Sequence, residues 1–99
     1  MSSRIGRIFS GLRASGRTGL VTYVTAGDPD ASRSAEILKV LDRAGADVLE
    51  VGVPFSDPLA DGPVIQRASE RALAGGATLA STLELIKGVR SDIQAAVVV

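Results

Sequence analysis

The sequence contains neither cysteine nor histidine among its 99 residues. These two absences exclude disulfides, thiolate nucleophiles, Ser-His-Asp triads and the usual zinc ligand sets. The chemistry that remains must come from carboxylates, lysine, tyrosine or the backbone. Aromatic residues amount to only 3% of the chain, against 45% hydrophobic residues overall. Any core is therefore mainly aliphatic, as in parallel α/β proteins.

Net charge and long apolar runs are absent as well. The chain has 11 basic and 11 acidic residues and a formal net charge of zero. Because no basic stripe alternates with aromatic residues, electrostatic capture of nucleic acid is not expected. No uninterrupted apolar run approaches the roughly 20 residues that span a bilayer. We expect a soluble, cytoplasmic protein whose partners are small or locally recognised.

Residues 1–18 combine arginines and serines with no acid, a composition that transit peptides and amphipathic helices share. Four apolar residues recur at helical spacing on one face: Ile5, Ile8, Phe9 and Leu12. Ser2 or Ser3 precedes them as a suitable N-cap. We favour an ordinary amphipathic helix over residues 2–15.

Three short runs rich in β-branched residues predict strands, at residues 20–25, 48–53 and 93–99. A helical pattern lies between the first two, so the chain returns across the sheet and these strands run parallel. A sheet of three parallel strands covers neither face well and leaves two open edges. We therefore expect residues 1–99 to form the amino-terminal portion of a single, larger α/β domain that is incomplete as it stands.

The helix predicted between the first two strands is capped by Asp28, has Pro29 in its first turn and ends at Gly45. Its apolar face is predicted to comprise Ile37, Leu38, Val40, Leu41 and Ala44.

Two further helices are predicted between the second and third strands. One begins at Pro63, runs to about Leu73 and is ended by Gly75 and Gly76. The next is capped by Thr78. Its inner face is predicted to comprise Leu79, Leu83 and Ile86.

The second predicted strand contains one carboxylate, Glu50, in an otherwise apolar run. Alternation places Glu50 and Gly52 on one face and the aliphatic Leu49 and Val51 on the other. In a closed barrel the face of Glu50 looks inward, and Gly52 leaves space above the carboxylate for a ligand. Because an ionised glutamate is rarely buried without reason, we favour a functional role for Glu50 over an arginine-paired glutamate at a sheet end.

A proline-stiffened loop follows, with three of the four prolines of the chain: Pro54, Pro58 and Pro63. The loop also holds Asp57 and Asp61. Taken alone, Asp61 is equally a helix cap, and Asp57 is by default a solvated loop residue. Two loop carboxylates without a phosphate loop are poor evidence for Mg²⁺, so we predict no metal.

Tyr23 lies near the carboxyl end of the first predicted strand, where ligands bind in parallel α/β folds. Its alternative role is to fill the interior of a barrel. In either case Tyr23 and Glu50 are expected to be neighbours.

Three segments together resemble the tryptophan synthase alpha chain family: YVTAGDPD at 23–30, AGADVLEVGVPFSDPLADGPVIQ at 44–66, and the following RASERALAGGATL. The run GVPFSDPLADGP is the most specific of these. The resemblance implies a TIM (β/α)₈ barrel with an extra amino-terminal helix over its floor. It also implies a lyase that cleaves indole-3-glycerol phosphate to indole and glyceraldehyde 3-phosphate in tryptophan biosynthesis.

The same resemblance assigns roles to individual residues. It implies that Glu50 transfers protons, that Asp61 accepts a hydrogen bond from the indole N–H, and that Tyr23 lines the indole pocket. It also implies that Asp57 contacts a beta chain within a heterotetramer, in which the beta chain carries pyridoxal phosphate and this chain carries no cofactor. Because the phosphate-binding loops of such barrels follow later strands, the 99 residues alone are expected to be inactive.

Two other hypotheses remain open. The chain could be a non-catalytic fragment or assembly module that pairs its open sheet edges with another copy. It could also belong to another phosphate-handling barrel enzyme, although the proline loop argues against this.

Overall fold

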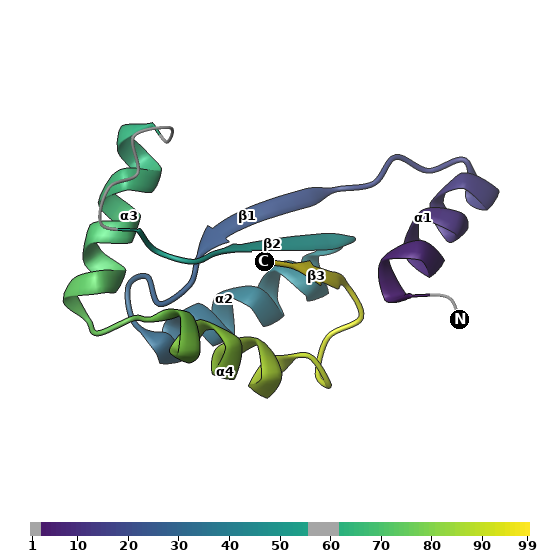
Figure 1. The fold of residues 1–99 in the computed structure, drawn as a ribbon. Coiled ribbons are helices and arrows are strands. Elements are labelled where there is room, and N and C mark those ends of the chain that lie inside the picture. Colours follow the sequence, from purple (N-terminus) through teal and green to yellow (C-terminus); the bar gives the residue numbers. More distant parts are fainter. Residues whose placement is uncertain (1–2, 56–61) are drawn as a thin grey trace.

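The structure is a computed structural model that describes residues 3–55 and 62–99. Its elements, in chain order, are α1 (Arg4–Ser15), β1 (Val21–Thr25), α2 (Ala31–Ala44), β2 (Val48–Gly52), α3 (Pro63–Ala74), α4 (Leu79–Val89) and β3 (Ala96–Val98). Helices α2 and α4 lie against one face of the sheet, α1 lies beyond the amino ends of the strands, and α3 lies beyond their carboxyl ends (Figure 1). Within the described ranges no helix is long and apolar enough to cross a membrane.

The three strands form one parallel sheet in the order β1-β2-β3. Tyr23 of β1 is the register partner of Glu50 of β2, and Glu50 is in turn the partner of Val98 of β3. The parallel arrangement and the expected neighbourhood of Tyr23 and Glu50 are thus confirmed.

Strand β3 is shorter than the predicted strand over residues 93–99. The backbone N–H groups of Gln94 and Ala95 donate to the Oδ1 atom of Asp42, on α2, at 3.0 and 2.9 Å. These two donors therefore bind a helix side chain and not a neighbouring strand. Regular pairing with β2 starts only at Ala96, which is the register partner of Val48.

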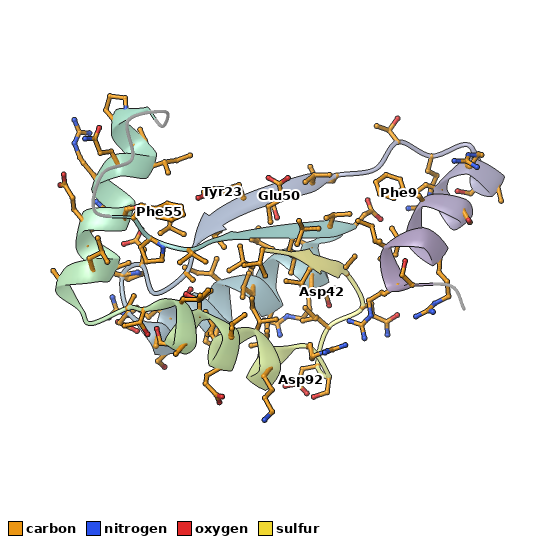
Figure 2. All side chains as sticks on the ribbon, in the orientation of Figure 1. Phe9, Tyr23, Asp42, Glu50, Phe55 and Asp92 are labelled. Carbon is orange, nitrogen blue, oxygen red and sulfur yellow. The ribbon has the colours of Figure 1, made fainter. Side chains whose placement is uncertain are left out.

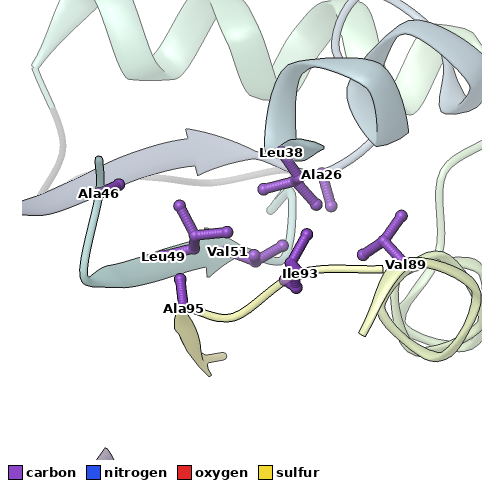
Figure 3. Packing of buried hydrophobic residues seen from close by; sticks show 8 residues of the cluster. All are labelled: Ala26, Leu38, Ala46, Leu49, Val51, Val89, Ile93 and Ala95. Atoms are coloured by element: carbon purple, nitrogen blue, oxygen red, sulfur yellow. The ribbon is translucent and has the colours of Figure 1, made fainter. Parts of the chain in front are cut away.

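The hydrophobic core lies between the sheet and helices α2 and α4 (Figure 3). Its buried members are Ala26, Leu38, Ala46, Leu49, Val51, Val89, Ile93 and Ala95. Leu49 and Val51 point into this core, as the alternation along β2 predicts. On the other face of β2, Glu50 is exposed to solvent, whereas Val48 is buried and Gly52 is half-buried.

Helix α2 ends at Gly45 as predicted, and Gly45 adopts a left-handed φ of 111°. The predicted cap is wrong, because the N-cap is Asp30, whose Oδ1 atom accepts a hydrogen bond from Arg33 N at 2.8 Å. The predicted apolar face is also only partly right. Leu38 is fully buried, whereas Ile37 and Val40 are exposed.

The inner face of α4 differs from the prediction more strongly. Leu79 and Leu83 are 57% and 50% exposed, while Thr82 is buried. The Thr82 hydroxyl donates to the Thr78 carbonyl oxygen at 2.9 Å, so this polar side chain needs no partner from the core. Thr78 is the N-cap of α4, as predicted.

Helix α1 confirms the predicted amino-terminal helix, with Ser3 as its N-cap. It makes both polar and apolar contacts with the rest of the fold. One guanidinium nitrogen of Arg4 lies 3.3 to 3.4 Å from three carbonyl oxygens of the segment that leads into β3, those of Arg90, Ile93 and Ala95. Leu12 is the buried residue of this helix.

Candidate functional site

Tyr23 and Glu50 lie side by side on the face of the sheet opposite α2 and α4 (Figure 2). Both side chains are exposed, and Tyr23 retains 44% of its accessible surface. A carboxylate beside a phenol on adjacent parallel strands is an arrangement that can hold and move protons next to an aromatic ligand. The strand geometry that the sequence predicts therefore brings these two candidate residues together.

The space above Gly52 is occupied by Tyr23, not free for a ligand as the sequence suggested. A Cβ atom built on Gly52 would overlap the hydroxyl and the ring of Tyr23. The phenol thus crosses from β1 over β2 toward the carboxyl end of the sheet. Such diagonal contacts between neighbouring strands are within reach of aromatic side chains.

Thr25 is the last residue of β1 and faces Gly52 across the sheet. Its Oγ1 atom is buried and has no hydrogen-bond partner among the residues that the structure describes. Buried polar groups are normally hydrogen-bonded, so this hydroxyl and that of Thr22 are exceptions within the described residues. Sequence reasoning did not select Thr25 as a site residue.

An ion pair joins α3 to the turn between β1 and α2. The Nε and Nη2 atoms of Arg71 donate to the two carboxylate oxygens of Asp28 at 2.8 and 3.1 Å. The hydrogen bond to Asp28 and the negative charge of that carboxylate raise the pKa of Arg71 above its ordinary value. The pair therefore fixes α3, the helix that follows the proline loop, relative to the strand that carries Tyr23.

Sequence reasoning missed this pair because it assigned Asp28 as a helix cap. Both Asp28 and Asp30 precede α2, and either spacing suits a cap. Arg71 lies 43 residues farther along the chain, so no local signal links it to Asp28.

The two loop acids, Asp57 and Asp61, lie outside the described residues. The loop resumes at Gly62, which is the N-cap of α3, and Pro63 occupies the first helical turn as predicted.

A cleft of about 220 Å³ borders Tyr23 and is lined by residues of β1, α2 and α3. Its lining includes Tyr23, Thr25, Val64 and Arg71 but not Glu50. Sites for small organic ligands usually measure ~300–1,000 Å³. This cleft is thus smaller than a usual ligand site, and Glu50 lies outside it.

A family model described as "Tryptophan synthase alpha chain" matches residues 9–99. Among curated relatives, the tryptophan synthase alpha chain of Burkholderia mallei is 56% identical over 92 residues, which are 93% of this chain and 34% of that protein. The alpha chain of Burkholderia thailandensis is 58% identical over 88 residues, covering 89% of this chain and 32% of its own length. The chain thus spans about a third of the length of these relatives.

Solved structures give the same result for the fold. The tryptophan synthase alpha subunit of Legionella pneumophila superposes with a TM-score of 0.93 at 41% identity, covering 98% of this chain and 37% of that one. Tryptophan synthase from Mycobacterium tuberculosis superposes with a TM-score of 0.89 at 40% identity over 99% of this chain and 39% of that one. A match over 99% of the chain includes α1, so this helix belongs to the shared fold, which is part of a TIM barrel.

Proposed function

The chain belongs to the tryptophan synthase alpha chain family, and from this we propose that it supplies the proton-transfer residues of an indole-3-glycerol phosphate lyase. In this proposal residues 1–99 are the amino-terminal part of one (β/α)₈ barrel domain, and the products are indole and glyceraldehyde 3-phosphate. The observation that carries the proposal is Glu50 on the open face of the sheet, next to Tyr23. We expect the protein to act in the cytoplasm.

The proposed reaction is a retro-aldol cleavage. The indole carbon that bears the glycerol side chain gains a proton, and the hydroxyl group on the adjacent side-chain carbon loses one. The carbon–carbon bond then breaks, its electron pair returns to the ring, and the side chain leaves as an aldehyde. A carboxylate that alternately accepts and donates a proton suits both transfers, and we assign this role to Glu50. Such acid–base catalysis is typically worth ~10²–10⁴ in rate.

Two further residues complete the proposed site. Asp61 would accept a hydrogen bond from the indole N–H and stabilise positive charge on the ring, an electrostatic effect of about 3 kcal/mol. Tyr23 would line the indole pocket with its ring. Because the Tyr23 side chain is about half exposed on the same face as Glu50, it can present this ring to a ligand.

A beta chain is the proposed protein partner, within a heterotetramer. In this proposal Asp57 contacts the beta chain, which receives indole and carries the pyridoxal phosphate. This chain itself would need neither a cofactor nor a metal, since the proposed steps require proton transfer alone.

We expect the 99 residues alone to release no indole. The described face is open, and the cleft beside Tyr23 is small and excludes Glu50. A test is a chimera in which this chain replaces the matching part of the Legionella pneumophila alpha subunit. The chimera should form indole from indole-3-glycerol phosphate, while the chain alone should not. A folded chimera without activity would contradict the proposed lyase role. Turnover by the chain alone would contradict the expectation that the 99 residues are inactive by themselves.

A second candidate is a module that self-associates, and the surface of the sheet favours it. Val21 and Val98 are exposed on the outer strands, and both of these strands have an unpaired edge in this structure. Exposed strand edges with apolar side chains promote pairing with another chain. Sedimentation velocity at increasing concentration separates the candidates, because a monomer at all concentrations would exclude self-association through these edges.

A further inference from the structure

Gly52 is the one glycine within the described strands, and its backbone conformation does not require a glycine. The glycines with positive φ are Gly16, Gly27, Gly45 and Gly76, each outside a strand. Gly52 is not among them, so residues with a side chain could adopt its backbone conformation. A glycine inside a strand weakens the strand and often marks a close approach by another group.

The group that approaches Gly52 is the phenol of Tyr23. A Cβ atom at position 52 would overlap the Tyr23 hydroxyl and two of its ring carbons. The contact is made by the far end of a side chain, which can rotate away about its first two torsions. Any larger residue at position 52 would therefore displace the ring before it disturbed the backbone.

The position of this ring bears on Glu50, which lies two residues before Gly52 on the same face of β2. Because Tyr23 is the register partner of Glu50, its ring crosses from β1 to β2 directly beyond the carboxylate. A displaced ring would rotate toward Glu50 or out into solvent. In both cases the aromatic surface beside the carboxylate would change.

We propose that Gly52 is a positioning residue. Because it has no side chain, the ring of Tyr23 can lie over β2 beside Glu50, where that ring forms the flat wall of the site. This wall fits a planar aromatic ligand that stacks on it or meets its edge. The identity of that ligand as an indole rests on the proposed function. The positioning of the ring rests on the contact between Gly52 and Tyr23 alone.

The chain offers a direct spectroscopic readout, since it has one tyrosine and no tryptophan. Its intrinsic fluorescence therefore reports Tyr23. In Gly52→Ala, quenching by acrylamide should change, because the exposure of the ring changes whether it rotates toward Glu50 or into solvent. Gly88→Ala is the matched control, since its added methyl group would meet nothing within 4 Å. Equal quenching in the unaltered chain and in Gly52→Ala, with both folded by circular dichroism, would overturn the proposal.

A second-site variant keeps the test decisive if Gly52→Ala folds poorly. In Tyr23→Leu the branched side chain is shorter and the overlap above position 52 is removed. The loss of stability caused by Gly52→Ala, measured as the urea midpoint, should then largely disappear in the double variant. An equal loss in both backgrounds would show that Gly52 acts through something other than Tyr23, and would also overturn the proposal. An inactive chimera would contradict the proposed lyase function without altering either result, so the two failures are distinguishable.

Discussion

Replacing Asp42 by alanine should destabilise the fold at the start of β3. The Oδ1 atom of Asp42 accepts hydrogen bonds from Gln94 N and Ala95 N at 3.0 and 2.9 Å. Hydrogen bonds to charged groups are worth ~1.5–3 kcal/mol each, and less where water can replace the acceptor. The N–H of exposed Gln94 can bind water, whereas Ala95 is buried. We therefore expect a loss of about 2–3 kcal/mol, nearly all of it from the Ala95 bond.

Urea unfolding followed by circular dichroism measures this loss. Asp42→Asn is the matched control, because the amide retains an oxygen that can accept both bonds, and it should lose less than half as much. Hydrogen exchange at Ala96, whose N–H donates to the Asp47 carbonyl oxygen at 3.0 Å, should accelerate in Asp42→Ala alone. Equal stability of Asp42→Ala and the unaltered chain would refute the role of this carboxylate in anchoring β3.

Three further experiments test the packing, the rim and a helix cap. Leu38→Ala should cost ~2–5 kcal/mol of unfolding free energy in urea, and Ile37→Ala, on the exposed side of the same helix, far less. A double-mutant cycle of Arg71→Met and Asp28→Asn should give a favourable coupling free energy of unfolding. This coupling should shrink as NaCl is added, because the pair is partly exposed. A coupling that does not change with salt would be inconsistent with an ion pair. Thr78→Ala should cost about 1 kcal/mol, since its side chain caps α4; an unchanged urea midpoint would disprove this.

Features that depend on neighbouring residues were predictable from the sequence. The alternation along β2 correctly assigned Leu49 and Val51 to the core and Glu50 to the opposite face. Gly45 was correctly identified as the end of α2, because a glycine after an apolar face supplies the left-handed conformation of a helix C-cap. The short connection between α2 and β2 was enough to predict parallel strands.

Features that depend on distant partners were not predictable. The interaction of Asp42 with the start of β3 joins residues more than 50 positions apart, and it shortens a strand whose composition suggested seven residues. Leu79 and Leu83 have helical spacing, but the face that α4 turns inward is set by its packing on α2 and the sheet. The spacing of apolar residues predicts that a helix buries one face, but it does not predict which neighbouring element covers that face.

The candidate site was predicted in outline. The sequence correctly predicted Tyr23 and Glu50 as neighbours, because residues near the carboxyl ends of adjacent parallel strands lie at the same edge of the sheet. The sequence predicted that the space above Gly52 holds a ligand, whereas the ring of Tyr23 occupies that space. A glycine in a strand indicates that something approaches closely, but only coordinates identify the approaching group.

The proposed function depends most on one role, the transfer of protons by the carboxylate of Glu50 in the cleavage of indole-3-glycerol phosphate. The most direct measurement is kcat of the Legionella chimera carrying Glu50→Gln, compared with the chimera carrying Glu84→Gln on the exposed surface of α4. The first substitution should lower kcat by ~10²–10⁴ while KM changes little, and the second should leave kcat unchanged. Equal rates of indole release by the two variants would contradict the claim.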